Sequence, residues 1–152
     1  MSYSIDANLL LYASNTGCAE HAAALDFMQR RVADPDLCCL AWSTLFAYLR
    51  ISTHPSIFRR PLAPEAAWTN VRALMRLPRV RIITEDQDFA DHYELLTRGS
   101  IIRGNLVPDA HLAALLHQHG VTRIYSNDTD FRKFPFLEVI SLESAVAAFR
   151  QD

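Results

Sequence analysis

Several features that mark whole classes of proteins are scarce in this sequence. Only three of its 152 residues are cysteines, namely Cys18, Cys38 and Cys39, and the last two are adjacent within an apolar stretch. An odd number of cysteines at these spacings forms neither a disulfide framework nor a zinc knuckle. We therefore expect buried free thiols, which are typical of proteins in a reducing cytosol.

Long apolar segments are missing as well. No run of residues approaches the roughly 18 apolar positions that a membrane-spanning helix needs. No basic segment followed by an apolar one marks the N-terminus as a signal peptide. These absences predict a soluble, cytoplasmic protein that has no contact with a membrane.

Positive charge comes almost entirely from arginine. Lys133 is the single lysine among the 15 lysine and arginine residues, which leaves 14 arginines, and the net charge is −2 with a pI near 6.3. So small a net charge excludes a strong global field that would attract nucleic acid or membranes. Arginine suits phosphate because its planar fork makes bidentate hydrogen bonds, although a codon bias of the source genome explains the same composition.

The chain has no low-complexity tract, linker or internal repeat, and half of its residues are hydrophobic. These properties suit a single domain, residues 1–152, with a sizeable core. Strand-like and helical stretches alternate, which predicts an α/β fold around a mainly parallel five-stranded sheet. We expect strands at 2–6, 37–41, 79–83, 121–125 and 137–141, and helices at 7–13, 21–33, 44–52, 65–77, 88–98, 106–120 and 142–150.

Particular residues mark the ends of these helices. Ser43 can cap the helix 44–52, and Pro64 suits the start of the next helix. Gly99 and Gly120 stand where a glycine commonly ends a helix. We expect these four residues to set helix boundaries.

Four aspartates stand where they can meet at one edge of the sheet. Asp6 comes at the end of the first strand, and Asp128 and Asp130 follow the fourth. Asp109 lies in the first turn of the helix that leads into the fourth strand, so this helix begins at the same edge. Connections between parallel strands are nearly always right-handed, and ligands bind at this edge where the strand order reverses. If the first and fourth strands flank that point, all four carboxylates converge.

Carboxylates that cluster in this way cannot all stay ionised unless a cation lies among them. Mg²⁺ takes one or two carboxylates and keeps several waters, and Mn²⁺ accepts the same oxygen ligands. Such an ion can activate a water and hold a phosphodiester for in-line attack. The four aspartates therefore predict hydrolysis of phosphodiester bonds by a metal-activated water.

Each aspartate also has a purely structural explanation. Asp6 can cap the helix after the first strand, and Asp109 is an acid at a helix N-terminus, where the dipole favours it. Asp128 and Asp130 can form a turn through side-chain hydrogen bonds. The metal site is favoured because three separate segments reach one edge.

Three segments of the sequence resemble motifs of a known family. SIDANLLLYA, LVPDAHLAAL and YSNDTDF are similar, in this order, to the opening, central and closing motifs of PIN-domain ribonucleases, and among them of VapC-like toxins of bacterial toxin–antitoxin modules. AWSTLFAYLRISTHPSIFRRPL also resembles the tryptophan-to-proline segment of one subgroup. The resemblance covers nearly the whole chain.

This resemblance implies an activity and a set of partners. It implies a three-layer α/β/α fold and a Mg²⁺- or Mn²⁺-dependent endoribonuclease that is the toxin of a type II toxin–antitoxin module. The implied partners are an RNA substrate, a cognate antitoxin protein that covers the site, and a second copy of the chain in a homodimer.

The resemblance also implies roles for individual residues. Asp6, Asp109 and Asp128 would coordinate the metal, and Asp130 would complete the catalytic set, binding directly or through water. Asn8 and Ser126 would orient water or phosphate. Every one of these positions matches the motifs quoted above.

One departure from the family pattern concerns the helix after the second strand. Many PIN nucleases carry a glutamate there, whereas Ala47 stands at about that position, and no Asp or Glu occurs between residues 37 and 64. The site is therefore less acidic, suited to one metal ion, and we expect an active nuclease. The alternative is a catalytically impaired PIN domain that binds RNA or protein. A receiver-type signalling domain fits poorly, because the only lysine, Lys133, follows the acidic pair within a loop.

Some further residues invite functional interpretations. Arg50, Arg59, Arg60 and Arg103 are candidates for phosphate contacts, with a solvated surface as the equal alternative. His54 lies in a loop and is better explained as part of a turn. Three histidines lack the i, i+4 spacing of a zinc pair, and we expect them at the surface or partly buried: His111, His117 and His119.

Two clusters remain. The acidic stretch 84–88 precedes a helix, so we interpret it as capping. An aromatic-rich middle should be mostly core, although its helices could leave a groove for a partner peptide or a second copy; its members are Trp42, Phe46, Tyr48, Phe58 and Trp68.

Overall fold

The central sheet has five strands, and every neighbouring pair is parallel. The structure, a computed structural model, describes residues 1–151. Its strands are β1 (Ser2–Ile5), β2 (Leu37–Ala41), β3 (Val80–Ile83), β4 (Arg123–Tyr125) and β5 (Glu138–Ile140). They lie in the order β3-β2-β1-β4-β5. The predicted parallel sheet is confirmed, and β1 lies beside β4, where the strand order reverses.

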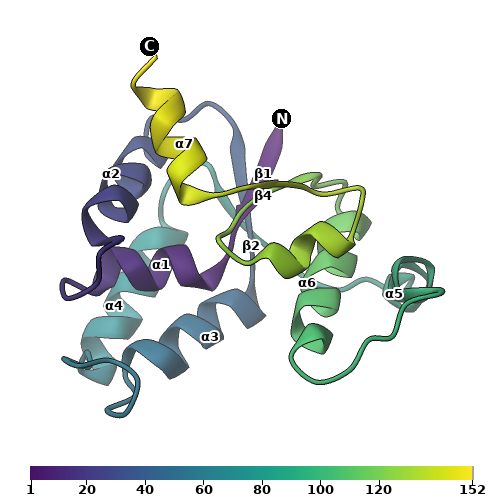
Figure 1. Ribbon diagram of the computed structural model, residues 1–152, viewed down its shortest axis with the longest axis horizontal. Helices are drawn as coiled ribbons and strands as arrows, with labels where there is room; N and C mark the ends of the chain where they lie inside the picture. The colour runs from purple at the N-terminus through teal and green to yellow at the C-terminus, as the bar shows by residue number, and fades with distance from the viewer. Residues whose placement is uncertain (152) are drawn as a thin grey trace.

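Helices cover both faces of this sheet (Figure 1). They are α1 (Ala7–Ser14), α2 (His21–Arg31), α3 (Trp42–Ser52), α4 (Pro64–Met75), α5 (Phe89–Thr97), α6 (Leu106–Gln118) and α7 (Leu142–Phe149). The sequence did not indicate a short 3-10 helix, η1 (Thr129–Lys133). Residues of α1–α4 and α7 form one hydrophobic cluster with the sheet, and residues of α6 and η1 form the other, against which α5 packs. The three-layer arrangement is therefore confirmed.

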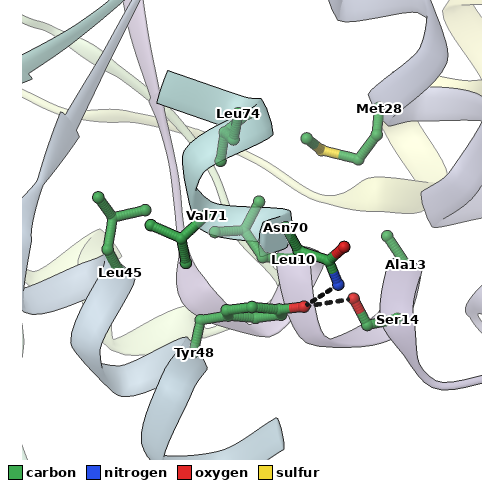
Figure 2. Close-up of a pocket in the computed structure, with 9 residues that line it drawn as sticks. All are labelled: Leu10, Ala13, Ser14, Met28, Leu45, Tyr48, Asn70, Val71 and Leu74. Carbon is green, nitrogen blue, oxygen red and sulfur yellow. Dashed lines mark hydrogen bonds between the residues drawn. The ribbon is translucent and has the colours of Figure 1, made fainter. Parts of the chain in front are cut away.

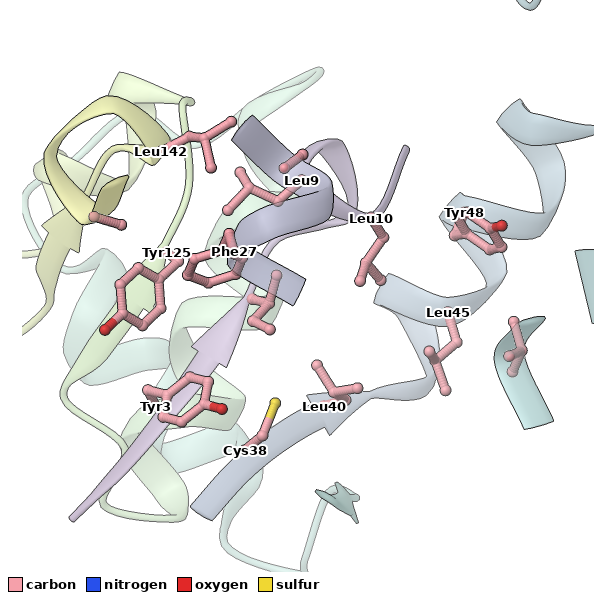
Figure 3. Close-up of a cluster of buried hydrophobic side chains, with 14 of the residues drawn as sticks. Tyr3, Leu9, Leu10, Phe27, Cys38, Leu40, Leu45, Tyr48, Tyr125 and Leu142 are labelled. Atoms are coloured by element: carbon pink, nitrogen blue, oxygen red, sulfur yellow. The ribbon is translucent and has the colours of Figure 1, made fainter. Parts of the chain in front are cut away.

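The first cluster is aromatic at its centre (Figure 3). Phe27 of α2 is fully buried, and its ring centroid lies 4.9 Å from that of Tyr125 in β4. The ring of Tyr3 in β1 meets the same Tyr125 edge-on at 5.5 Å. Such tilted and edge-on pairs are the favoured geometry of aromatic rings, and they tie β1 and β4 to α2.

The second strand is buried on both faces, which explains its unbroken apolar sequence. Successive side chains of a strand point to opposite faces. Cys38 and Leu40 accordingly belong to the first cluster, whereas Cys39 and Ala41 belong to the second, under α6. All three thiols are free, as predicted, but only Cys38 and Cys39 are buried, whereas Cys18 is partly exposed. Burial raises the pKa of Cys38 to about 12, so this thiol stays protonated.

Most of the predicted helix ends are confirmed. Pro64 opens α4, and Gly99 and Gly120 follow α5 and α6 with φ of 77° and 68°, a backbone that only glycine adopts readily. The prediction that Ser43 caps a helix is wrong. The chain passes directly from β2 into α3, so Trp42 begins the helix, Ala41 takes the cap position and Ser43 lies inside the first turn.

The part of the chain that the structure describes contains no helix long and apolar enough to cross a membrane.

Candidate metal centre

The pairing of β1 with β4 sets the position of the first aspartate. Ile5 is the register partner of Tyr125, so the residues that follow, Asp6 and Ser126, emerge side by side. The backbone N–H of Asp6 donates to the Tyr125 carbonyl at 3.0 Å, and that of Ser126 donates to the Ile140 carbonyl at 2.9 Å. Backbone bonds therefore fix both residues at the carboxyl edge of the sheet.

The hydroxyl of Ser126 joins two of the predicted aspartates. Its Oγ donates to Asp6 Oδ2 at 2.7 Å and accepts from the backbone N–H of Asp128 at 2.9 Å. Ser126 is 2% exposed, so no solvent competes for these bonds. Ser126 thus orients a carboxylate and a backbone turn.

The structural explanations for these aspartates also apply. Asp6 is the N-cap of α1, and its Oδ1 accepts from the backbone N–H of Ala7 at 2.7 Å. Asp128 caps η1, and its Oδ1 accepts from the backbone N–H of Asp130 at 2.9 Å. In each residue one oxygen is used by the cap, which holds the carboxylate in a fixed orientation.

Three of the four predicted aspartates come together as a group. One carboxylate oxygen from each of Asp109, Asp128 and Asp130 lies within 4.8 Å of the others. Asp109 reaches this group from the first turn of α6. Asp6 stands outside the group, but it is close enough for its charge to raise the pKa of Asp109.

The electrostatics of the group show a shortage of positive charge. Burial, followed by the charges of Asp128, Asp6 and Asp130, raises the pKa of Asp109 to about 7. Burial also raises the pKa of Asp6, against the hydrogen bonds from Ser126 and Ala7. Burial and the neighbouring carboxylates both disfavour the ionised form of these two acids.

Lys133 is the one ion-pair partner that the four aspartates have within residues 1–151. Its Nζ lies 3.4 Å from Asp130 Oδ1, and the two side chains are 58% and 44% exposed. So exposed a pair contributes little. Several negative charges therefore remain unbalanced, and an oxygen-only ligand set with this charge fits a hard divalent cation.

A pocket of about 150 Å³ opens beside Asp6 and Asp109. The start of α3 forms part of its wall through Ser43, Thr44 and Ala47. Ala47 thus faces the space beside two of the acids, at about the position where many PIN nucleases carry a glutamate. Ser43 and Thr44 were not among the predicted site residues, although they lie in the first turn of the helix that follows β2 at the same edge, which was the available signal.

Asn8 lies in the first turn of α1, two residues beyond Asp6. Its Oδ1 is buried and has no hydrogen-bond partner in the described chain. Buried amide oxygens are nearly always satisfied, so this atom is an unused acceptor in the first turn of α1. Its predicted role toward water or phosphate stays a prediction.

The acidic stretch 84–88 provides the N-cap position of α5 but makes no side-chain cap bond, which corrects the prediction of a capping role in that respect. Asp88 occupies the cap position without a side-chain cap bond. Its carboxylate instead accepts from Gln118 Nε2 at 2.6 Å and pairs with His92 at 3.2 Å. Glu85 likewise pairs with His111 at 2.5 Å. These two acids therefore bind side chains of α6, namely Gln118 and His111, and His92 of α5, instead of the backbone N–H groups at the start of α5.

The exposure of the three histidines agrees with the prediction, and the candidate arginines are at the surface. His111 and His117 are partly buried and His119 is exposed, as predicted. The arginines named as phosphate candidates are all exposed, and none forms an ion pair within residues 1–151: Arg50, Arg59, Arg60 and Arg103. Their contact with phosphate stays a prediction.

The aromatic-rich middle is only partly core, contrary to prediction. Tyr48 and Phe58 are buried, whereas Trp42, Phe46 and Trp68 are 39%, 57% and 44% exposed. Trp42 and Phe46 belong to α3 and Trp68 belongs to α4, so part of the apolar surface of both helices is exposed.

A mainly apolar pocket of about 160 Å³ lies among α1, α2, α3 and α4 (Figure 2). The Tyr48 hydroxyl is hydrogen-bonded to Ser14 Oγ at 2.7 Å and accepts from Asn70 Nδ2 at 3.0 Å. The other lining residues are Leu10, Ala13, Met28, Leu45, Val71 and Leu74. The helices therefore leave a groove, as the sequence allowed.

This fold and this acidic edge are those of the PIN domain, and the PIN family profile matches residues 3–137. The chain belongs to the PIN-domain family. It is 39% identical over 139 residues to Ribonuclease VapC48 of Mycobacterium tuberculosis, which covers 91% of this chain and 96% of that protein. It is 36% identical over 130 residues to Ribonuclease VapC37 of the same species, with coverage of 86% and 90%.

Solved structures share the fold. VapC20 of Mycobacterium tuberculosis, described as a sarcin-ricin loop cleaving toxin, superposes with a TM-score of 0.63 and 24% identity over 91% of this chain and 98% of that one. VapBC2 of Rickettsia felis, bound to a DNA fragment from its promoter, gives a TM-score of 0.66 and 16% identity over 93% and 98%. At these identities the likeness supports the fold alone.

The raised pKa of Asp109 predicts a pH-dependent stability of the metal-free protein. The folded state holds the Asp109 proton up to about pH 7, whereas the unfolded chain loses it near pH 4. The free energy of unfolding therefore falls as pH rises between these values. In EDTA, we expect Asp109→Asn to flatten this fall and to stabilise the protein at pH 8 by about 1–2 kcal/mol, measured by urea denaturation.

The matched control for this experiment is Asp91→Asn, which changes an exposed aspartate of α5. It should leave the pH dependence as in the wild type. Parallel curves for Asp109→Asn and the wild type would show that the carboxylates do not repel one another.

Proposed function

We propose that the protein is an endoribonuclease, the toxin of a toxin–antitoxin module, which hydrolyses RNA phosphodiester bonds at the aspartate cluster with Mg²⁺ or Mn²⁺. The observation that carries this proposal is the meeting of Asp109, Asp128 and Asp130 beside a fixed Asp6. Relatives that are 36–39% identical over most of the chain are named ribonucleases, which supports the reaction.

The residues of the cluster divide into ligands and supports. Asp109, Asp128 and Asp130 would hold the cation, since their oxygens are within 4.8 Å of one another. When bound, a hard divalent cation lowers the pKa of a coordinated water and neutralises charge on the phosphate. Asp6, whose Oδ2 accepts from Ser126, would act as a further ligand, directly or through a water. Ser126 would fix the orientation of Asp6, which follows β1, and of Asp128, which follows β4.

Asp109 would also exchange its proton for the cation. With a pKa of about 7 in the absence of a cation, its carboxyl is about half protonated at pH 7 and becomes mostly protonated as the pH falls below that value. The cation would displace that proton, because ligands bind metals in their deprotonated form. Lys133, beside Asp130, is placed to contact a phosphate oxygen as a point charge.

An antitoxin would dock on the groove of Figure 2. The groove is lined mainly by aliphatic side chains, with Tyr48, Ser14 and Asn70 hydrogen-bonded on one side. An amphipathic helix places apolar residues at i, i+3 and i+4 into such a groove. Related solved structures are named VapBC complexes, which supports a protein partner.

A second copy of the chain would cover the exposed rings of α3. Trp42 and Phe46 are neighbours on one helix face, with ring centroids 6.1 Å apart. Exposed paired aromatics are characteristic of protein interfaces. This face adjoins the pocket wall formed by Ser43 and Ala47, so a homodimer would bring two sites near each other.

The second candidate function is an impaired PIN domain that binds RNA or protein without cleavage. Ala47 favours it, because the wall beside Asp6 and Asp109 lacks a carboxylate. Three clustered acids nonetheless suffice for one ion that keeps its waters, so we favour the nuclease.

Loss of a single aspartate tests the reaction. We expect Asp109→Asn and Asp6→Asn to reduce cleavage of a cellular RNA pool by about 100-fold or more, since each removes a charge at the cation. Cleavage is measured as discrete products in Mg²⁺ or Mn²⁺ that EDTA abolishes. Asp88→Asn is the matched control, because Asp88 pairs with Gln118 and His92 outside the cluster. Equal products from all variants would contradict the assignment.

Addition of a carboxylate distinguishes the two candidate functions. We expect Ala47→Glu to bind Mn²⁺ about 10-fold more tightly, because a further acid would face the pocket beside Asp6 and Asp109. Calorimetry measures the affinity, and Ala47→Gln controls for side-chain volume. If the wild type is inactive and Ala47→Glu alone cleaves RNA, the binding function is the native one.

A further inference from the structure

Another pocket, of about 300 Å³, differs in character from the pocket beside the aspartates and from the apolar groove. It is lined by the end of α1 and the following turn and by two consecutive arginines; the residues are Ser14, Asn15, Thr16, Gly17, Arg59 and Arg60. Every lining residue except the glycine has a polar side chain. The apolar face of a helix would therefore not be complementary to this pocket, whereas it would be complementary to the groove of Figure 2.

The loop that carries the arginines is held in place. The Leu62 N–H donates to the Ser52 carbonyl at 2.8 Å, which closes the loop at its base, and the Phe58 N–H donates to the His54 carbonyl at 3.0 Å. Phe58 is only 5% exposed. Arg59 and Arg60 thus follow directly after a buried anchor, and their backbone position is fixed.

The opposite wall is ordered as well. The Gly17 N–H donates to Asn15 Oδ1 at 3.2 Å, and the Cys18 N–H donates to the Asn15 carbonyl at 3.2 Å. These bonds shape the turn between α1 and α2 that faces the arginines. The pocket therefore has two defined sides.

The charge in this pocket is not balanced by any acid. Elsewhere in the chain Arg30, Arg31 and Arg123 are paired with aspartates. Arg59 and Arg60 have neither an ion pair nor a side-chain hydrogen bond in the part of the chain that the structure describes, and residues 37–64 contain no acid. Two neighbouring free guanidinium groups favour an anion, and their planar forks match phosphate.

The pocket lies at the far end of the helix that begins at the metal centre. Asp6 caps the start of α1, and Ser14 is its last residue, so the two ends are separated by about 12 Å along the helix axis, at 1.5 Å per residue. Helix α3 packs beside α1 and also begins at the acidic edge (Figure 1). A nucleic-acid strand that bound at both sites would therefore run along α1 from its first turn to its end.

We propose that Arg59 and Arg60 form a phosphate-binding site for the RNA strand, a few nucleotides from the bond that is cleaved. This proposal rests on the proposed ribonuclease function. The site supplies positive charge that the acidic centre lacks, and it holds the substrate backbone in a register that presents one phosphodiester to the aspartates. Phosphate contacts of this kind position a strand without reading its sequence.

RNA binding in EDTA tests this site apart from cleavage. The probes are fluorescein-labelled oligouridylates of about 4 and about 12 nucleotides, which bracket the usual lengths bound by single-strand sites. We expect Arg59→Ala/Arg60→Ala to bind the longer probe about 10-fold more weakly, measured by fluorescence anisotropy. The slope of log K against log salt should shrink by about 0.7 for each phosphate that the double variant no longer neutralises. The wild type should gain affinity with probe length, and the double variant should gain less.

Two further variants control for charge and shape. Arg72→Ala/Arg76→Ala removes the same charge from exposed arginines of α4 and its end, and it should change affinity less than about 2-fold, since screening weakens distant charges. Arg59→Lys/Arg60→Lys keeps the charge but loses the fork, and it should bind with intermediate affinity.

Several outcomes would overturn the proposal. Equal losses of RNA affinity in Arg59→Ala/Arg60→Ala and Arg72→Ala/Arg76→Ala would mean that only the overall charge of the protein determines binding. Unchanged RNA binding combined with altered self-association of Arg59→Ala/Arg60→Ala, measured by light scattering, would assign the surface to protein contacts. RNA binding that depends on the arginines, without any cleavage, would support this phosphate site and refute the nuclease function. Cleavage and RNA binding that do not change in Arg59→Ala/Arg60→Ala would support the nuclease function and refute this phosphate site.

Discussion

The parallel pairing of β1 with β4 is the constraint on which the site depends. It makes Asp6 and Ser126 neighbours at the end of the sheet, and the Ser126 hydroxyl then joins the Asp6 carboxylate to the backbone of Asp128. A shift of one residue in this register would turn these side chains to the other face. The aromatic contacts of Tyr125 with Phe27 and Tyr3 stabilise the same pair of strands within the core, so core packing and site geometry have one origin.

The carboxylates of the site repel one another, and a bound cation would offset this repulsion. Hydrogen bonds fix the orientation of Asp6 and Asp128, and α6 brings Asp109 to them, so the acids cannot move apart without breaking caps. The protein balances part of this charge by keeping a proton on Asp109 and part through Lys133. Function and stability are therefore opposed here, which is common at sites where charges are gathered for a ligand. The arginine pocket at the other end of α1 supplies the complementary charge for an anionic strand.

Much of this arrangement could be predicted from the sequence, because alternating apolar segments define a parallel sheet and the ends of its strands share one edge. Asp6, Asp109, Asp128 and Asp130 could be located in this way. Prediction failed where the choice depended on neighbours distant in sequence: Asp88 pairs with Gln118 of α6 instead of capping α5. Ser43 was assigned to a cap because no residue signals that β2 passes directly into α3. The outward position of Trp42 and Phe46 also depends on how far α3 is covered, which no local pattern states.

The number of protons released when the cation binds gives the sharpest test of this metal centre. Calorimetric titration of Mn²⁺ near pH 6, in two buffers of different ionisation heat, gives this number for the wild type and for Asp109→Asn. Because Asp109 keeps its proton to about pH 7, the wild type should release close to one proton, and the release should decline above pH 7. Asp109→Asn should bind more weakly and release almost none. Binding without proton release, or no binding at all, would contradict the claim that these carboxylates exchange a proton for a metal ion.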